Sequence, residues 1–254
     1  MEIRYTLAVV TGAGGGLGRE IAVALSRLGA AVVVADRDVA AAQETVDLVC
    51  AARVRGWAVQ ADLAQEDDVR LLAARVRDLG GADVLVNNAG GWTEGAEQYP
   101  AAPDEAWSRT LDLNLRSPML LTRLFLDDLD ARRGRRQVGA VVNVGSSAGV
   151  GRDGYGSPEY AAAKAGLVRL TTALGDPETA RRARVMAVVP GWIGLPRAHE
   201  QWAALTEEER AGLSLVEPAD VVRVVMDLLL RGAAGEVVEI LDGTQPVPNR
   251  TSLA

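Results

Sequence analysis

Short apolar runs rich in valine alternate along the chain with longer amphipathic stretches. The short runs are typical of strands buried on both faces, and the longer stretches repeat apolar residues with the period of a helix. The predicted strands lie at 6–11, 31–35, 56–61, 83–87, 138–145, 183–189 and 236–241. The predicted helices lie at 16–28, 38–52, 65–79, 103–127, 157–175, 200–211 and 217–231.

This alternation predicts an α/β fold of the Rossmann type. Strand and helix units joined by right-handed crossovers build a doubly wound parallel sheet, here seven-stranded, with helices on both faces. No linker interrupts the pattern, so we predict a single domain over residues 1–254, with a substrate-covering segment near 192–215. Ligands bind such sheets at the carboxyl ends of the strands.

A glycine-rich loop follows the first predicted strand and opens the first predicted helix. Its residues are Gly12, Ala13, Gly14, Gly15, Gly16, Leu17 and Gly18. Glycine permits a tight turn and a close approach of the backbone to a pyrophosphate, and the helix N-terminus supplies free N–H groups. A glycine loop between a strand and a helix predicts a dinucleotide-binding site.

The second predicted strand ends in Asp36, about twenty residues past the glycine loop. A carboxylate at this place accepts hydrogen bonds from the adenosine ribose and repels a 2′-phosphate. The next residue, Arg37, is suited to pair with such a phosphate. We therefore expect NAD as the cofactor, with NADP as the less favoured alternative. Asp36 is also placed to cap the following helix.

Tyr160 and Lys164 stand one helical turn apart in the run SPEYAAAKAGL, and Ser147 precedes the tyrosine by thirteen residues. Residues at positions i and i+4 share one face of a helix. An ammonium group beside a phenol favours the phenolate, so we expect Lys164 to lower the pKa of Tyr160 from about 10. A tyrosine with a lowered pKa serves as a general acid or base.

These motifs together resemble the short-chain dehydrogenase/reductase family in its compact single-domain form, from about Thr6 to Gly243. The matching residues after the glycine loop are Asp62, Leu63, Asn87, Asn88, Ala89, Gly90, Asn114, Ser147, Tyr160, Lys164, Pro190 and Gly191. The resemblance implies an oxidoreductase that transfers a hydride between a nicotinamide cofactor and a secondary alcohol or ketone. It also implies a catalytic tetrad of Asn114, Ser147, Tyr160 and Lys164.

The family pattern implies a role for each member of the tetrad. Tyr160 exchanges a proton with the substrate oxygen, which Ser147 orients. Lys164 binds the nicotinamide ribose, and Asn114 holds a water that relays protons to it. The implied cofactor contacts are Gly12, Gly14, Gly15, Gly16, Leu17, Gly18, Asp36, Arg37, Asp62, Leu63, Asn88, Ala89, Gly90, Tyr160, Lys164, Pro190, Gly191 and Ile193.

Two positions depart from the family. Leu195 stands five residues after Pro190, where a threonine usually contacts the nicotinamide carboxamide, and Met186 stands where asparagine is common. The expected substrate contacts are Trp92, Ser147, Tyr155, Trp192 and His199. Because binding sites are mostly apolar, the tryptophans favour a cyclic or aromatic substrate. Packing within the loops is the alternative explanation for them.

Two other classes of function remain open. Gly145 to Gly149 match GxSxG, the nucleophile elbow of serine hydrolases, with Ser147 as the nucleophile and His199 as the only histidine. The glycine-rich segment after this motif disfavours the helix that the elbow requires. A dinucleotide-sensing binding protein without catalysis is the other alternative, although it would not need both Tyr160 and Lys164.

Composition limits the partners and the location. A net charge of −7 disfavours a nucleic-acid or anionic-membrane surface, and no apolar run of 18 residues is present. The single cysteine, Cys50, excludes an intrachain disulfide and suits a reducing compartment. We therefore expect a cytoplasmic enzyme of a small-molecule substrate, without a metal. The family resemblance implies a homo-oligomer, a tetramer or a dimer, that pairs through the helices near 103–127 and 157–175.

Overall fold

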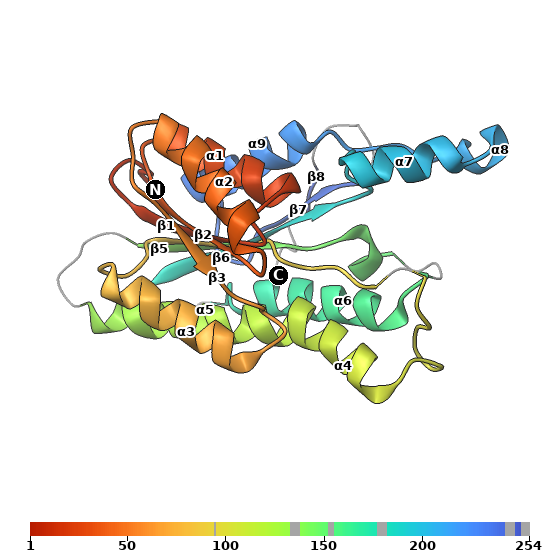
Figure 1. The fold of residues 1–254 in the computed structure, drawn as a ribbon, viewed down its shortest axis with the longest axis horizontal. Coiled ribbons are helices and arrows are strands. Elements are labelled where there is room, and N and C mark those ends of the chain that lie inside the picture. The colour runs from red at the N-terminus through yellow and green to blue at the C-terminus, as the bar shows by residue number, and fades with distance from the viewer. Residues whose placement is uncertain (94, 133–137, 152–154, 177–181, 242–246, 250–254) are drawn as a thin grey trace.

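The computed structural model describes residues 1–93, 95–132, 138–151, 155–176, 182–241 and 247–249, the last three by their backbone alone. These residues form three layers, in which one sheet lies between two layers of helices (Figure 1). Gly243, the last residue of the family resemblance, lies outside the described residues.

The sheet has the strand order β3-β2-β1-β4-β5-β6-β7-β8. Seven strands are parallel, as predicted: β1 (Leu7–Thr11), β2 (Ala31–Asp36), β3 (Gly56–Gln60), β4 (Val84–Asn87), β5 (Gly139–Val144), β6 (Ala183–Pro190) and β7 (Val237–Ile240). An eighth strand, β8 (Val247–Asn249), pairs antiparallel with β7 and was not predicted. It is short and contains Pro248, which local sequence patterns assign to an edge or a turn.

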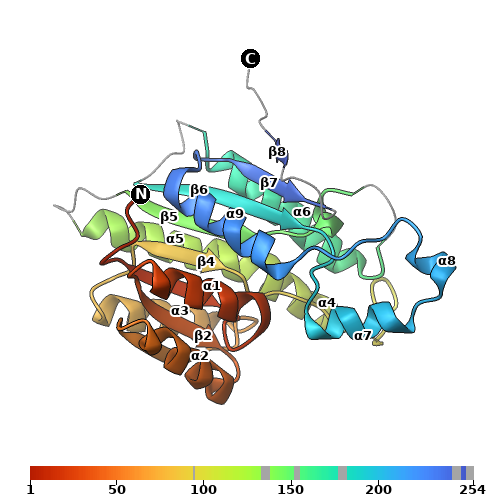
Figure 2. The same ribbon diagram turned by 90° about the horizontal axis from the view of Figure 1, so that it is seen from above.

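Helices cover both faces of the sheet (Figures 1 and 2). One face carries α1 (Gly16–Arg27), α2 (Val39–Ala51) and α9 (Pro218–Arg231). The other carries α3 (Glu66–Asp78), α4 (Asp104–Leu111), α5 (Ser117–Ala131) and α6 (Pro158–Ala173). The remaining helices, α7 (Pro196–Ala204) and α8 (Glu207–Arg210), lie at the carboxyl edge of the sheet.

Two of the predicted helices are divided. The one predicted at 200–211 is α7 followed by α8, which starts anew because Thr206 and Glu209 form a capping box. The one predicted at 103–127 is α4, a π-helical turn η1 (Asp112–Arg116), and α5. Pro118 has no N–H to donate to the carbonyl of Asn114 four residues earlier, so an α-helical bond is impossible there.

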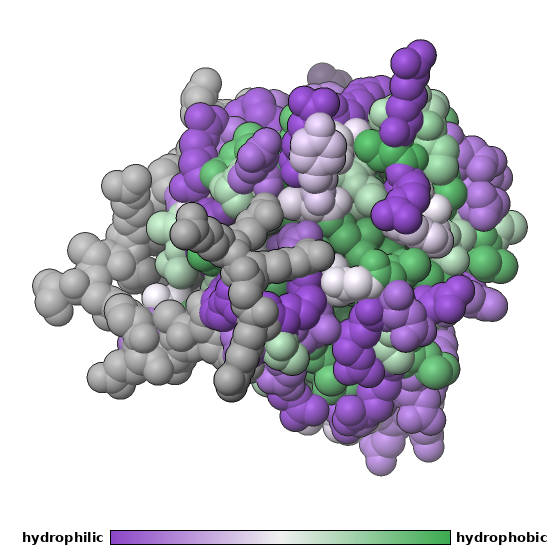
Figure 3. Space-filling view, turned by 90° about the vertical axis from the view of Figure 1, so that its left-hand side faces the viewer, coloured by the Kyte–Doolittle hydropathy of each residue, from purple (hydrophilic) through white to green (hydrophobic). Residues whose placement is uncertain are grey.

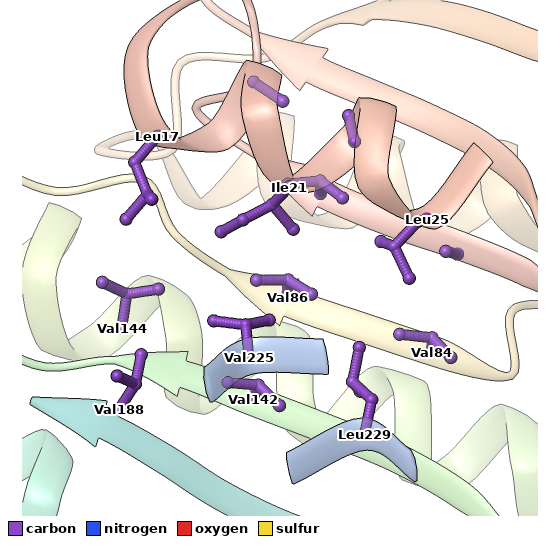
Figure 4. Packing of buried hydrophobic residues seen from close by; sticks show 14 of the residues in the cluster. Leu17, Ile21, Leu25, Val84, Val86, Val142, Val144, Val188, Val225 and Leu229 are labelled. Carbon is purple, nitrogen blue, oxygen red and sulfur yellow. The ribbon is translucent and has the colours of Figure 1, made fainter. Parts of the chain in front are cut away.

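Apolar residues from the sheet and the helices form one core on each face. In Figure 4, Leu17, Ile21 and Leu25 project from α1 towards Val84 and Val86 of β4. All five side chains are buried, which fixes α1 on the sheet. The glycine loop before α1 is thereby held at the carboxyl end of β1.

Candidate active site

The segments that sequence analysis assigned to a site meet at the carboxyl edge of the sheet. A cavity of about 830 Å³ runs along this edge, a volume that suits a cofactor and a small substrate. Its predicted lining residues are Gly12, Asp36, Arg37, Asp62, Leu63, Asn88, Ala89, Gly90 and Trp92. It is also lined by Arg109, Glu159 and Arg197, which sequence analysis did not assign.

Asp36 is fixed against the glycine loop. One carboxylate oxygen accepts a hydrogen bond from the Gly14 N–H at 2.8 Å, and the other accepts from the Asp38 N–H at 3.0 Å. A Cβ atom at Gly14 would lie 2.9 Å from the carboxylate carbon, so any larger residue here would displace the Asp36 side chain. The N-cap of α2 is Asp38 and not Asp36, which leaves Asp36 at the cavity.

The glycine loop has the geometry of a phosphate cradle. Gly12 and Gly16 have φ angles of 61° and 51°, which glycine adopts without steric cost. A side chain at Gly18 would collide with the carbonyl oxygen of Gly12. The amide of Asn88 donates to the carbonyl of Gly12 at 3.1 Å and so ties this loop to the end of β4. The Leu17 side chain lies in the core, so only its backbone faces the loop.

A charged pair lines the cavity beyond Asp36. Arg109 donates to the carboxylate of Asp62 at 2.7 Å. Burial on its own would raise the pKa of Asp62, but the hydrogen bond and the charges of Arg109 and Arg37 outweigh burial and lower it. Asp62 therefore stays ionised, and Arg37 lies on the same wall.

Tyr160 and Lys164 lie buried on α6, as their spacing predicted. The Lys164 ammonium donates to the carbonyl of Val144 at 2.8 Å and lies 5.6 Å from the centre of the Tyr160 ring. Burial lowers the pKa of Lys164 from 10.5 to about 8.

The pKa of Tyr160 is raised, not lowered. Burial of the phenol is the main cause, and a hydrogen bond to Ser146 offsets it in part. The expectation that Lys164 lowers the pKa of Tyr160 is wrong for this structure, because burial of the phenol dominates.

Ser146, and not Ser147, is hydrogen-bonded to the hydroxyl of Tyr160. Ser146 ends the turn after β5 and accepts from the Ala148 N–H at 3.2 Å, as the N-cap of the short 3₁₀ helix η2 (Ser147–Gly149). Within the described residues, the Ser147 side chain makes no hydrogen bond. A 3₁₀ turn, and not an α-helix, follows the strand, so the structure gives the hydrolase elbow no support.

Asn114 lies fully buried in the π-helical turn. Its side chain accepts from the Gly91 N–H at 2.9 Å and donates to the carbonyls of Gly91 and Thr110, each at 2.8 Å. A Cβ atom at Gly90 would lie 2.7 Å from Asn114 Oδ1 and 2.9 Å from Lys164 Nζ. The asparagine therefore lies beside the lysine, with its amide committed to the backbone.

Aromatic rings surround Tyr160. The centre of the Trp92 ring lies 4.6 Å from that of Tyr160 and 5.4 Å from that of Tyr155, and the two tyrosine rings lie 5.9 Å apart. Two of the predicted substrate contacts thus border the proposed general acid. By contrast, Trp192 packs on Trp202 at 5.8 Å within the covering segment.

The covering segment begins where β6 ends. The Gly191 N–H donates to the carbonyl of Ile240 at 2.7 Å, and Ile193 forms a bridge with Val216. Leu195 is the N-cap of α7, and a Cβ atom on Gly16 would lie 3.4 Å from its side chain. Leu195 thus lies over the glycine loop. His199 is exposed on α7.

Polar or charged residues of this site that were not predicted from the sequence include Ser146, Arg109, Glu159 and Arg197. The side chain of Glu159 is buried, and the Tyr99 N–H donates to its carboxylate at 3.4 Å. One overlooked signal supports the assignment of Lys164: it is the only lysine among 27 basic residues. The other 26 basic residues are all arginine, so a lysine at position 164 indicates that this position requires an amine.

The described residues contain no cluster of histidine, cysteine or carboxylate side chains suited to a metal ion. No helix among them is long and apolar enough to cross a membrane.

Comparisons with known proteins agree with this geometry. A family model described as short chain dehydrogenase matches residues 6–205. The (3R)-3-hydroxyacyl-CoA dehydrogenase of Mus musculus is 32% identical over 259 positions, which cover 96% of this chain and 97% of the relative. The cyclohexanol dehydrogenase of Acinetobacter sp. strain SE19 is 32% identical over 228 positions, or 88% of this chain and 87% of the relative.

Solved structures have the same fold. A 7α-hydroxysteroid dehydrogenase complexed with NADH and 7-oxo glycochenodeoxycholic acid has a TM-score of 0.81 at 26% identity, over 95% of both chains. The L-sorbose reductase of Gluconobacter frateurii, complexed with NADPH and L-sorbose, also has a TM-score of 0.81 at 26% identity, over 96% of this chain and 98% of that one.

Proposed function

Because the chain belongs to the short-chain dehydrogenase/reductase family, we propose that this oxidoreductase transfers a hydride between NAD and a cyclic or aromatic secondary alcohol or ketone. The observation that carries the proposal is the burial of Tyr160 beside Lys164 and against Trp92, which itself lines the large cavity at the carboxyl edge of the sheet. The glycine loop and Asp36 fit the phosphate and ribose groups of a dinucleotide.

The nicotinamide, when bound, supplies or accepts the hydride. Tyr160 gives a proton to the carbonyl oxygen in reduction and takes it from the hydroxyl in oxidation. The raised pKa of Tyr160 keeps the phenol protonated, which suits the reductive direction. Ser146, which is hydrogen-bonded to the phenol, would donate a second hydrogen bond to the substrate oxygen. Ser147, which the family spacing favours, is the alternative donor.

Lys164 and Asn114 complete the proton path in this proposal. Lys164 has a pKa of about 8, so it exchanges protons readily near neutral pH. The Asn114 amide is fully used, so a relay water would bind its backbone carbonyl, for which Pro118 has no N–H.

The cofactor preference follows from charge. Asp36, held against the glycine loop, would bind the ribose hydroxyls of the cofactor, and its negative charge would oppose a 2′-phosphate. We expect NADH to bind more tightly than NADPH, and Asp36→Ala to narrow the difference about 10-fold through loss of a charge-assisted bond. Fluorescence titration with both dinucleotides measures this. A preference of the wild-type protein for NADPH would show that Arg37 dominates.

The substrate class follows from the aromatic wall. Trp92 and Tyr155 offer flat apolar surfaces beside the Tyr160 ring, and ring-shaped substrates bury such surfaces well. Two of the similar proteins are named for cyclic alcohols, cyclohexanol and a hydroxysteroid, which supports a cyclic substrate.

A panel of cyclic, aromatic and linear alcohols and ketones, assayed for NAD(H) turnover, tests the function. Tyr160→Phe should retain the fold and NADH binding but lose turnover about 10²-fold or more, because the proton donor is gone. Near wild-type turnover in the Phe variant would refute the assignment. Dinucleotide binding without turnover on any substrate would favour the sensing protein, and ester hydrolysis without dinucleotide binding would favour the hydrolase.

A further inference from the structure

A second large cavity lies at the opposite edge of the sheet, where the strands begin. Its volume is about 970 Å³, and it is lined by residues that precede β1, β2 and β3 and by the ends of α1, α2 and α3. Figure 3 shows this edge of the molecule, where hydrophobic surface is exposed between hydrophilic side chains. None of the active-site residues lines this cavity.

Four arginines line this cavity: Arg4, Arg27, Arg53 and Arg55. All four side chains belong to exposed residues. Within the described chain, none of the four guanidinium groups forms an ion pair. The whole chain has a net charge of −7, so a concentration of unpaired positive charge stands out from the rest of the surface.

Negative groups nearby do not cancel this charge. Three helix C-termini reach the cavity, at Leu28, Ala52 and Leu79, and each carries about half a negative charge. The carboxylate of Asp83 accepts from the Leu7 N–H at 3.1 Å and lies 3.5 Å from the guanidinium of Arg132. Four full positive charges therefore exceed the helix dipoles.

The guanidinium groups of two of these arginines lie over aromatic rings. The guanidinium of Arg4 lies 5.0 Å from the centre of the Tyr5 ring, and that of Arg55 lies 5.2 Å from the centre of the Trp57 ring. Tyr5 is 84% exposed, although tyrosine gains stability from burial of its ring. The ring is thus available to a ligand.

Two cavity residues have an unusual backbone conformation. Tyr5 and Arg53, with φ angles of 66° and 62°, are the only residues other than glycine with positive φ in the described chain. Bulky side chains adopt this region at a free-energy cost that glycine avoids. A turn by itself would favour glycine or asparagine at both places. Arg53 directly follows the C-cap of α2, where a left-handed residue often ends a helix, and both residues line the cavity.

We propose that this cavity binds a nucleoside polyphosphate. Guanidinium groups pair with phosphate oxygens through two parallel hydrogen bonds, and several phosphates are needed to match four arginines. The exposed Tyr5 ring offers a surface on which a nucleobase stacks. The volume exceeds what a triphosphate nucleotide needs. This second site does not depend on the proposed dehydrogenase function.

Calorimetric titration with ATP tests the proposal. The titration is made with and without saturating NADH, because ATP also resembles the adenosine half of a dinucleotide. We expect one ATP to bind per chain in the presence of NADH. Arg4→Ala combined with Arg55→Ala should weaken this binding at least 10-fold, whereas Arg223→Ala on α9 should leave it unchanged. Binding that NADH abolishes, or that survives the double variant, would overturn the second site.

Tyr5→Gly separates ligand binding from folding. Glycine adopts the positive φ of this residue freely, so the melting temperature should stay the same or rise. ATP binding should nevertheless weaken about 10-fold through the loss of stacking, while binding of inorganic tripolyphosphate should not change. Equal binding of ATP by the wild-type protein and by Tyr5→Gly would refute the role of the ring.

Discussion

At the scale of single residues, the two serines after β5 are the candidates for holding the substrate oxygen. Spacing and the family pattern favoured Ser147, but the hydrogen bond to Tyr160 is made by Ser146. A one-residue difference in position places a side chain on another side of the η2 turn. The two serines are adjacent and chemically identical, so each is the control for the other.

We predict that Ser146→Ala lowers kcat about 10²-fold, the usual cost of losing one donor to the reacting oxygen. Ser147→Ala should lower kcat no more than about 3-fold. Steady-state kinetics on the best substrate of the panel gives the comparison, and melting curves show whether the loss of the η2 cap destabilises the Ser146 variant. The reverse order of effects would restore Ser147 to the tetrad.

The buried ammonium of Lys164 lowers the stability of the folded protein. The fall of its pKa from 10.5 to about 8 means that folding costs the charged amine about 3 kcal/mol. Lys164→Met should therefore stabilise the protein at pH 7 by about 2 kcal/mol, after about 1 kcal/mol for the lost bond to Val144, and abolish turnover. Urea denaturation measures the stability, with the exposed Arg169→Met as the control on the same helix.

The pH dependence of this effect has a defined sign. Between pH 8 and pH 10.5 the unfolded chain holds a proton on Lys164 that the folded protein has released. Stability therefore rises with pH by about 3 kcal/mol across this window, so the advantage of Lys164→Met disappears within it and the wild-type protein is the more stable at its upper end. Because Lys164 is the only lysine, protein labelled with ¹⁵N-lysine gives one side-chain signal, and NMR titration measures its pKa directly. A pKa near 10.5 would contradict this account.

At the scale of elements, the π-helical turn η1 and the start of α7 lie next to candidate site residues. The π-helical turn η1 interrupts the long helix beside Lys164 and buries Asn114, and Pro118 imposes the break. The start of α7 lacks a side-chain cap. Its N-cap residue, Leu195, has no side-chain oxygen to accept a hydrogen bond from the N–H groups of the first turn. Leu195 instead lies against the glycine loop.

We predict that Leu195→Thr stabilises α7 by about 1 kcal/mol, because threonine accepts a hydrogen bond from the first turn. It should also tighten NADH binding several-fold, since it restores the polar group usual at this place in the family. Hydrogen exchange of the α7 amides and NADH titration measure the two effects. Leu205→Thr, the same change at the C-cap, should produce neither. Weaker NADH binding by Leu195→Thr would show that the apolar contact with the loop is preferred.

At the scale of the whole molecule, we propose that the protein is a homo-oligomer, a tetramer or a dimer. The outer surface of α5 exposes Met119 to 45%, and Leu120 and Leu124 are only partly buried beside it. We expect pairing with a second copy through α5 and α6, which removes this apolar surface from water. Light scattering at micromolar concentration should give a multiple of the monomer mass, and Met119→Glu should lower it. A monomeric mass for the wild-type protein would refute the proposal.

The sequence determined the features that depend on neighbours along the chain. Apolar runs predicted all seven parallel strands. The runs of β1, β2 and β5 are rich in valine because these strands are buried on both faces, whereas the edge strand β3 is only partly buried. The glycine loop and the separation of Tyr160 from Lys164 were equally local signals, since a strand, a turn and one helical face each span few residues.

Only the tertiary structure decided what depends on distant segments. The pKa of Tyr160 rises because α6 buries the phenol against Trp92 and the end of β5, which no spacing reveals. The hydrogen bond of Tyr160 to Ser146, and not to Ser147, depends on how the η2 turn packs against α6. The arginine cavity likewise collects residues from the starts of β1, β2 and β3. Burial and the convergence of separate strands set these properties, and both arise only when the chain is packed.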